Sequence, residues 1–216
     1  MQITWYGQSC FKITSGDLVV ILSPFNKKIG LNPPRGRADI VLFSDNNGSE
    51  ELPSFEGGFV INGEGEYEVK GVLISGVSYY HGEKNRPRKS TVYTIEIEGV
   101  SICHLDNVSK SEVESILDKI GAVDILMIPV GGKHKFDDLE SHTLNAEEAV
   151  GVVGEIEPRI AIPMYYQVPK LAVKLDGADK FLKAMGAEKT EFLSKFSVKK
   201  KDLPQGETKV VVLKLE

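Results

Sequence analysis

The order in which strand-like and helix-like patterns follow one another is what most constrains the fold of this chain. Up to residue 105 the apolar residues come in short runs of strand length, separated by turns that contain glycine. These runs lie at 3–7, 9–14, 17–22, 38–43, 58–63, 67–80, 90–99 and 100–105. Helical spacing begins only after residue 108. This order predicts two β-sheets packed together, with helices covering their outer faces.

The second half of the chain alternates strands with amphipathic helices. Residues 109–122 predict a helix with Ser109 or Ser111 as its N-cap, and residues 144–158 predict a second helix capped by Asn145. The remaining predicted elements are buried strands at 123–130 and 159–164, a helix at 177–187 and a final strand at 208–216. A chain of 216 residues suits one domain, which we expect to span residues 1–216.

Composition excludes several classes of function. The net charge is -5, from 31 acidic and 26 basic side chains, so no basic excess is available for a nucleic-acid partner. No apolar run approaches the roughly 18 residues of a membrane span, and no signal peptide is visible, so we expect a cytoplasmic protein without a membrane partner. The two cysteines, Cys10 and Cys103, lie in apolar runs and are expected to be buried thiols and not a disulfide.

Six short segments carry a resemblance to a known family: WYGQSCFKI, LSPF, FSDNNGSE, ICHLDN, VDILMIPVGG and IPMYY. In this order and spacing they resemble the metallo-β-lactamase superfamily. More closely, they resemble its short stand-alone branch of predicted zinc-dependent hydrolases, related to the L-ascorbate-6-phosphate lactonases. The resemblance extends over nearly the whole chain and implies an α/β (α+β) fold, the αββα sandwich of that superfamily.

The resemblance also marks where such proteins hold their metal ions, and every one of these positions is changed. The family's T-H-x-H-x-D-H loop falls on residues 44–50, and its W-x-G-H, D-P-F, H-L-G-D and I-P-M-H-Y patterns fall on four other segments. The residues at the former metal-site positions are Gln8, Ser23, Asp45, Asn47, Ser49, Glu50, Asn107 and Tyr165. Zinc prefers imidazole, thiolate and carboxylate ligands, whereas most of these side chains offer amide or hydroxyl oxygens. We therefore expect no metal, no cofactor and no hydrolysis by the superfamily's mechanism.

The resulting prediction is a pseudo-hydrolase that acts by binding or assembly, as a homo-oligomer or beside an intact paralogue, with a small-molecule ligand that the sequence does not identify. An alternative keeps the enzyme: Asp45, Glu50 and Asp106 would hold a divalent cation such as Mg²⁺, Mn²⁺ or Zn²⁺, or act as acid and base without metal. Its substrate would be a phosphorylated or lactone small molecule.

Other residues are expected around the same pocket. These possible pocket residues are His81, His104, Asp106 and Tyr166. His81 is either a substrate-contacting group or a hydrogen-bonded loop residue, and a hydrogen bond is expected to fix the tautomer of His104. By the resemblance, Tyr79, Tyr80, Tyr165 and Tyr166 would face the former metal cavity or its rim and fill its volume.

Two charged segments complete the set of candidates. His134 and His142 flank an acidic stretch and are expected to be exposed to solvent, although together with Asp137 and Asp138 they would make a new metal site. The cationic residues Lys84, Arg86, Arg88 and Lys89 are expected to form a solvated loop, with binding of an anion as the alternative. Val130, Gly131 and Gly132 are expected to form a tight turn and not a phosphate loop.

Overall fold

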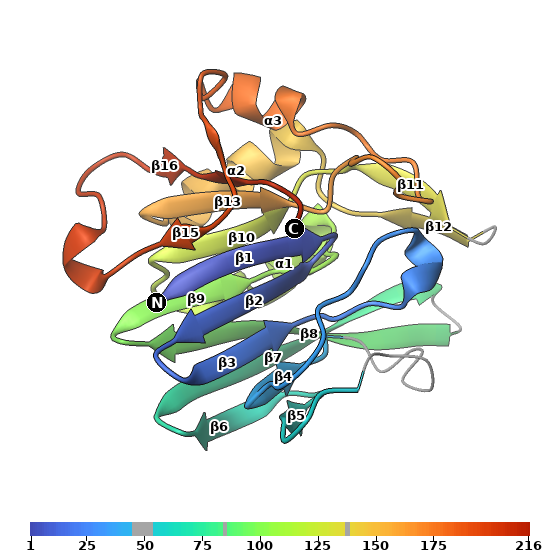
Figure 1. The fold of residues 1–216 in the computed structure, drawn as a ribbon. Helices are drawn as coiled ribbons and strands as arrows, with labels where there is room; N and C mark the ends of the chain where they lie inside the picture. Colours follow the sequence, from blue (N-terminus) through green and yellow to red (C-terminus); the bar gives the residue numbers. More distant parts are fainter. Residues whose placement is uncertain (45–53, 84–85, 137–138) are drawn as a thin grey trace.

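Two packed β-sheets form the centre of the molecule in the computed structural model (Figure 1), which describes residues 1–44, 54–83, 86–136 and 139–216. Within these residues the first sheet has six strands, in the order β15-β1-β2-β3-β4-β5, and the second has seven, in the order β16-β13-β10-β9-β8-β7-β6. The predicted pair of sheets is therefore confirmed.

The first sheet begins as an antiparallel meander and continues in parallel. Its strands are β1 (Gln2–Gly7), β2 (Cys10–Ser15), β3 (Leu18–Leu22), β4 (Ile40–Leu42), β5 (Phe59–Ile61) and β15 (Phe196–Ser197). The pairs β1–β2 and β2–β3 are antiparallel, whereas β3–β4 and β4–β5 are parallel. The parallel pairing carries the carboxyl ends of β3 and β4 to the same edge of the sheet, where candidate site residues follow.

The second sheet joins an antiparallel half to a parallel half. Its strands are β6 (Gly65–Val69), β7 (Val72–Glu83), β8 (Arg86–Ile97), β9 (Val100–His104), β10 (Ile125–Pro129), β13 (Ile160–Met164) and β16 (Lys209–Val210). Pairing is antiparallel from β6 to β9 and parallel from β9 to β16. Two short pairs lie outside these sheets: β11 (Lys133–Phe136) with β12 (Leu139–His142), and β14 (Phe192–Leu193) with β17 (Val212–Leu213).

The prediction of one strand over residues 67–80 is wrong, because the chain reverses inside this stretch. Lys70 and Gly71 have φ angles of 52° and 78°, and they join β6 to β7 as a two-residue hairpin turn. Positive φ at both turn residues matches the right-handed twist of the flanking strands. Glu98 and Gly99, with φ of 53° and 72°, connect β8 to β9 in the same way.

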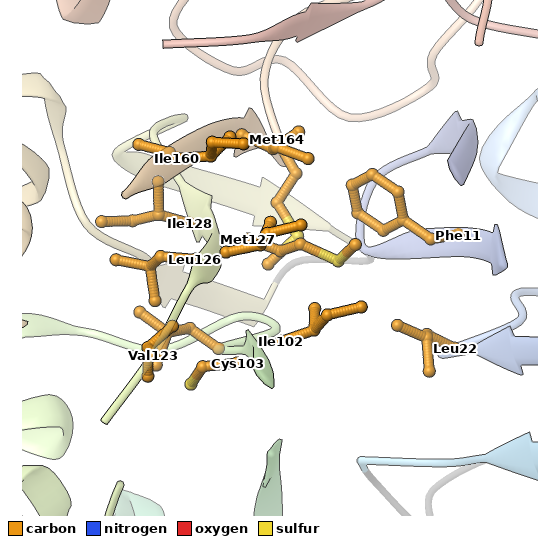
Figure 2. Close-up of a cluster of buried hydrophobic side chains, with 14 of the residues drawn as sticks. Phe11, Leu22, Ile102, Cys103, Val123, Leu126, Met127, Ile128, Ile160 and Met164 are labelled. Atoms are coloured by element: carbon orange, nitrogen blue, oxygen red, sulfur yellow. The ribbon is translucent and has the colours of Figure 1, made fainter. Parts of the chain in front are cut away.

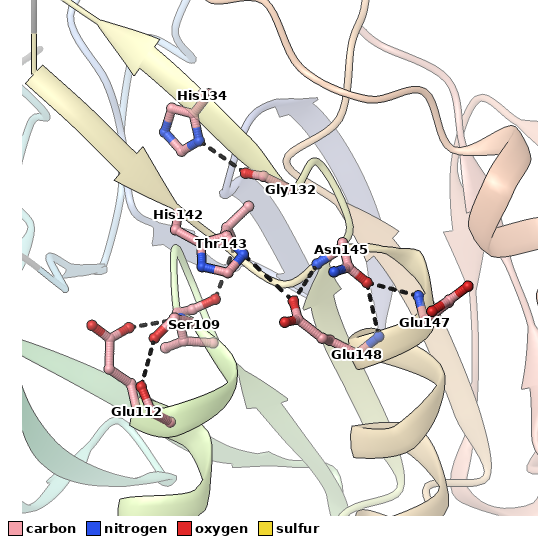
Figure 3. Close-up of polar contacts among 11 residues, drawn as sticks. Ser109, Glu112, Gly132, His134, His142, Thr143, Asn145, Glu147 and Glu148 are labelled. Atoms are coloured by element: carbon pink, nitrogen blue, oxygen red, sulfur yellow. Dashed lines mark hydrogen bonds and ion pairs between the residues drawn. The ribbon is translucent and has the colours of Figure 1, made fainter.

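Within the described residues three α-helices lie on the side of the seven-stranded sheet: α1 (Lys110–Ile120) against β7, α2 (Ala146–Ile156) against β10, and α3 (Asp179–Ala184) against α2. The expected caps are present (Figure 3). The Asn145 amide oxygen accepts hydrogen bonds from the backbone N–H groups of Glu147 and Glu148, both at 3.0 Å. Ser109, and not Ser111, caps α1, where its backbone N–H donates to the Glu112 carboxylate at 2.6 Å.

The main core fills the space between the two sheets and the space under the helices. Met127 points toward Phe11 of the first sheet, whereas Leu126 and Ile128, its neighbours along β10, point the other way (Figure 2). Alternation along a strand gives a central strand two apolar faces, which explains its continuous apolar sequence. A second cluster of Cys10, Ile21, Ala38 and Val41 lies apart from this core, and side chains of irregular segments such as Phe25 and Phe55 pack against it. In the part of the chain that the structure describes, no helix is long and apolar enough to cross a membrane.

Candidate functional site

The carboxyl ends of five strands converge at one edge of the sandwich and bring together polar residues that are far apart in sequence. Ser23 follows β3, Ser44 follows β4 and Asp106 follows β9. The Ser23 hydroxyl lies 3.1 Å from the Ser44 hydroxyl and donates to the Asp106 carboxylate at 3.4 Å. Gln8 and Tyr165 follow β1 and β13, and the Tyr165 backbone N–H donates to the Gln8 carbonyl at 3.2 Å. We call this group the polar centre; it consists of Gln8, Ser23, Ser44, Asp106 and Tyr165.

Four of these five residues have left-handed backbone geometry. The φ angles are 48° at Gln8, 41° at Ser23, 57° at Asp106 and 53° at Tyr165. A residue with a side chain pays about 1 kcal/mol or more for this conformation, so it persists only where the surrounding structure enforces it. The enforcing contacts include Trp5 Nε1 donating to the Gln8 carbonyl at 2.8 Å, and the Ser23 N–H donating to the Leu42 carbonyl at 2.8 Å. Such clustered strain is typical of a functional site.

The long hairpin of β7 and β8 holds Ser44 in place. The Ser44 carbonyl accepts from the Thr91 backbone N–H at 2.8 Å, and the Thr91 hydroxyl lies 3.3 Å from that of Ser78. The Tyr93 hydroxyl reaches across to the other sheet and donates to the Phe43 carbonyl at 3.1 Å. The site-facing side of this hairpin therefore carries neutral hydroxyl groups beside the polar centre.

Burial and the Asp106 carboxylate together shape the electrostatics of the polar centre. Burial, and after it the Asp106 carboxylate, raises the pKa of the Cys10 thiol and of the Tyr165 hydroxyl. Both groups are therefore neutral at physiological pH. None of the ion pairs between residues that the structure describes involves Asp106.

His104 is a buried, hydrogen-bonded residue, as expected. It is 1% exposed, its Nε2 donates to the Ser9 carbonyl at 2.7 Å, and its ring meets Phe11 edge-on with 6.1 Å between ring centroids. Burial lowers the pKa of His104, so the imidazole is neutral. Cys103 lies on the other face of β9 (Figure 2), and burial raises the pKa of its thiol to about 12. The two adjacent residues therefore do not form a nucleophile and base pair.

The prediction that His134 is exposed to solvent is wrong. His134 is 8% exposed, its Nδ1 lies 3.2 Å from the Gly132 carbonyl (Figure 3), and its Nε2 lies 3.4 Å from the Tyr165 hydroxyl. The β11–β12 pair brings it over Tyr165, with 5.4 Å between ring centroids. No sequence pattern pointed to this contact, because β11 lies in a charged stretch. His142 remains partly exposed, with Nε2 3.6 Å from the Glu148 carboxylate, and Asp137 and Asp138 lie outside the described residues.

Several expected pocket residues lie away from the polar centre. Tyr166 is buried against Trp5, with 4.8 Å between ring centroids, and its hydroxyl donates to the Leu213 carbonyl at 3.4 Å. The His81 Nε2 lies 2.9 Å from the Ser90 hydroxyl. Since Tyr93 pairs with Gly76 and strand residues alternate, Tyr79 and His81 occupy the opposite face of the hairpin from Tyr93.

Two further candidates of the same hairpin lie at its surface. Tyr80 is 66% exposed, and the Lys89 ammonium donates to the exposed Glu64 carboxylate at 2.8 Å. The former metal-site positions Asp45, Asn47, Ser49 and Glu50 lie outside the residues that the structure describes.

The donor set of the described positions does not fit zinc. Among the described residues no group of three or more His, Cys, Asp or Glu side chains is placed to hold a metal ion. Within the residues that the structure describes, the side-chain oxygens Gln8 Oε1, Ser9 Oγ and Asn107 Oδ1 are buried without a hydrogen-bond partner. Amide and hydroxyl oxygens are weak zinc ligands compared with imidazole or thiolate. Tyr165 also places an aromatic ring where the resemblance expects a histidine ligand.

The glycines after β10 are explained by packing. A Cβ atom on Gly131 would lie 2.1 Å from the Tyr165 carbonyl oxygen, and Gly132 has a φ of 69°. Both positions therefore require glycine, in an irregular connection between β10 and β11. The close approach of Gly131 also fixes where the backbone of Tyr165 lies.

Comparison with known proteins places this geometry in context. A family model described as the beta-lactamase superfamily domain matches residues 2–165. A UPF0173 metal-dependent hydrolase of Methanopyrus kandleri is 24% identical over 201 residues, which cover 77% of this chain and 84% of the relative. A solved structure from Thermotoga maritima, described as a candidate Zn-dependent hydrolase of the metallo-β-lactamase superfamily, has a TM-score of 0.76 and 28% identity and covers 98% of this chain and 97% of its own. Igni18, a metallo hydrolase of Ignicoccus hospitalis, shares the fold, with a TM-score of 0.57, 15% identity and coverage of 92% and 99%.

Proposed function

The chain belongs to the β-lactamase superfamily, in its stand-alone metallo-β-lactamase branch, and we propose that it acts there by binding or assembly and not as a zinc hydrolase. The single observation that carries this proposal is the chemistry of the side chains at the former metal-site positions that the structure describes. Where the resemblance expects histidine and aspartate ligands, the described residues offer Gln8, Ser23, Asn107 and Tyr165. The strand-end backbone that presents these side chains remains strained, which supports a site that still has a use.

The residues of the polar centre suit hydrogen bonding better than catalysis. In a zinc hydrolase the ion supplies the activated water, by lowering the pKa of the water it holds. Here the Ser23 hydroxyl lies 3.1 Å from the Ser44 hydroxyl and 3.4 Å from the Asp106 carboxylate. His104 Nε2 already donates to the Ser9 carbonyl, so this nitrogen is not available to a ligand. These groups would orient a polar ligand by accepting and donating hydrogen bonds.

The second candidate function is a hydrolase with a substituted, oxygen-ligated metal site. It is favoured by the relatives, several of which are named metal-dependent hydrolases. Asp106 would share a hard cation with Asp45 and Glu50, and the substrate would be a phosphorylated or lactone small molecule. This candidate requires that each of the three carboxylates be needed for turnover.

An activity screen after metal loading distinguishes the two candidates. Purified protein would be dialysed separately against Zn²⁺, Mn²⁺ and Mg²⁺ and assayed with ester, lactone and phosphodiester substrates. Our proposal predicts no turnover above that of a matched variant, Asp106→Asn, in any condition. Glu68→Gln, which changes an exposed carboxylate on β6, is the control for charge removal elsewhere. Turnover that survives in Glu68→Gln and disappears in Asp45→Ala, Glu50→Ala and Asp106→Asn would establish the hydrolase instead.

Assembly is tested on the same preparation. Light scattering reports whether the chain forms a homo-oligomer, and co-purification with a paralogue that retains the T-H-x-H-x-D-H loop reports a mixed complex. A monomer that captures no such paralogue would leave ligand binding as the remaining form of the proposal.

A further inference from the structure

The short connection between β5 and β6 carries the chain from the first sheet to the second (Figure 1). It begins with the pair Asn62-Gly63, which is not part of the polar centre. Asn62 is exposed and lies outside regular secondary structure. Within the described residues, neither the Asn62 side chain nor the Gly63 backbone N–H makes a hydrogen bond. No described group therefore restrains either of them.

Glycine at position 63 removes a steric barrier to a reaction between these two groups. A Cβ atom on Gly63 would meet nothing within 4 Å, and the φ angle of Gly63 is not in the left-handed region. Packing and backbone conformation therefore do not require glycine here, in contrast to Gly131. The effect of the glycine is an unhindered backbone nitrogen next to an amide side chain.

The other asparagines that the structure describes are restrained or followed by an unsuitable residue. Asn26 and Asn145 each accept a hydrogen bond from the backbone N–H two residues further along the chain. Asn107 has a buried amide oxygen and is followed by a β-branched residue, which crowds the next backbone nitrogen. Asn32 precedes a proline, which has no N–H. Asn62 thus differs from them in combining exposure, an unrestrained amide and a following glycine.

We propose that Asn62 is a site of spontaneous deamidation. The Gly63 backbone nitrogen attacks the side-chain carbonyl carbon of Asn62, and a bond forms between these two atoms. The amide nitrogen of Asn62 leaves as ammonia and takes with it the proton that the Gly63 nitrogen gives up. Water then opens the cyclic imide at either of its carbonyl carbons, which gives aspartate or isoaspartate. The reaction needs no enzyme, and it is independent of the proposed function.

Isoaspartate at this position would alter the connection between the two sheets, because it adds one methylene group to the backbone before Gly63. The Gly63 carbonyl oxygen lies 3.4 Å from both the Tyr67 and the Tyr93 hydroxyls. It also lies so close to β7 that a Cβ atom on Gly76 would be 2.7 Å from it. A longer backbone displaces this carbonyl from its contacts. The modified protein is therefore expected to unfold at a lower urea concentration.

The test is a time course of the protein in mildly alkaline buffer, in which the backbone N–H loses its proton more readily. Peptide mapping by mass spectrometry detects deamidation as a gain of about one dalton, and chromatography separates isoaspartate from aspartate. Gly63→Ala is the matched variant: its Cβ enters open space, so it is expected to fold and to deamidate several-fold more slowly. Asn145 is the internal reference. It is expected to react faster in denaturant than in the native protein, whereas Asn62 reacts at similar rates in both.

Asn47 also precedes a glycine and lies outside the described residues, so the peptide map assigns each site separately. Conversion at Asn47 without conversion at Asn62, or no conversion at either, would overturn the proposal. Equal rates at Asn62 in the unmodified protein and in Gly63→Ala would overturn it too, as would strong protection of Asn62 by the native fold. A urea midpoint that does not change after conversion would overturn the effect assigned to isoaspartate. Each of these outcomes leaves the proposed function untouched.

Discussion

Asp39 lies directly before β4, the strand that leads to Ser44. Replacing it tests how the first sheet is fixed to the second. Its carboxylate is 3% exposed and accepts hydrogen bonds from the Val19 backbone N–H at 2.9 Å, from Arg37 at 2.9 Å and from Lys70 at 2.5 Å. Lys70 lies in the turn between β6 and β7, so this carboxylate connects the two sheets. The perturbation is Asp39→Asn, which keeps the size of the side chain and removes its charge.

The expected loss is about 2 kcal/mol in the free energy of unfolding at pH 7. A hydrogen bond to a charged group contributes about 1.5–3 kcal/mol, and the amide of the variant keeps only a neutral acceptor for the Val19 N–H. Arg37 and Lys70 are 63% and 55% exposed, so each ion pair adds at most about 1 kcal/mol after screening by solvent. In the variant, Arg37 and Lys70 can be hydrated by water instead. The loss in free energy of unfolding is therefore smaller than for a fully buried ion pair.

The pH dependence follows from the direction of the pKa shift. The hydrogen bond from Lys70, and after it that from Val19, holds the pKa of Asp39 well below its usual range. A lowered pKa contributes stability above the unfolded pKa of about 3.9, and this contribution is lost as the pH falls toward the folded pKa. The difference in stability between the unmodified protein and Asp39→Asn is therefore expected to be smaller at pH 3 than at pH 7.

Urea unfolding at both pH values, followed by the fluorescence of Trp5, measures this difference. Asp118→Asn, at an exposed position on α1, is the control and should change stability by less than about 0.5 kcal/mol. A loss below about 0.5 kcal/mol in Asp39→Asn, or a loss that is equal at pH 3 and pH 7, would refute the assigned role of this carboxylate.

Three further changes test the packing described above. Gly131→Ala places a Cβ atom 2.1 Å from the Tyr165 carbonyl oxygen and is expected to lower the free energy of unfolding in urea by about 3 kcal/mol. The control Gly154→Ala, in open space on α2, should not destabilise the protein. Equal effects of the two changes would contradict the close approach at Gly131. Asn145→Ala removes two 3.0 Å capping bonds and should cost about 1 kcal/mol, a loss that Asn145→Asp should largely restore. Both cysteine thiols are buried with raised pKa, so a disulfide reagent at pH 8 should modify them slowly in native protein and rapidly in denaturant; fast native reaction would contradict their burial.

The sequence predicts the order of elements well because periodicity reports which faces are buried. Both long helices and the N-cap Asn145 are where the apolar spacing places them. The hairpin at Lys70 was not predictable by the same means, because Lys-Gly is a weaker turn signal than Asn-Gly and the adjacent Val69 and Val72 both favour strands. The β11–β12 pair was missed because charged residues conceal its strand pattern.

The candidate site, too, was predicted from the sequence only in part. The resemblance identifies Gln8, Ser23 and Tyr165 as neighbours, and the structure brings them together at the strand ends. The sequence gives the chemical type of each side chain, but it does not predict the hydrogen-bond partner of that side chain. The contact of Tyr165 with His134, and the unpaired amide oxygen of Gln8, depend on tertiary packing that no local pattern encodes.

The measurement that tests the central claim most directly is the metal content of the purified protein, determined by elemental mass spectrometry. The protein would be prepared without an affinity tag or chelator and measured again after dialysis against Zn²⁺, Mn²⁺ and Mg²⁺. A centre built from amide and hydroxyl oxygens predicts metal far below one ion per chain in every sample. One bound ion per chain that is lost in Asp45→Ala or Glu50→Ala would contradict the account and show that the site has exchanged its metal.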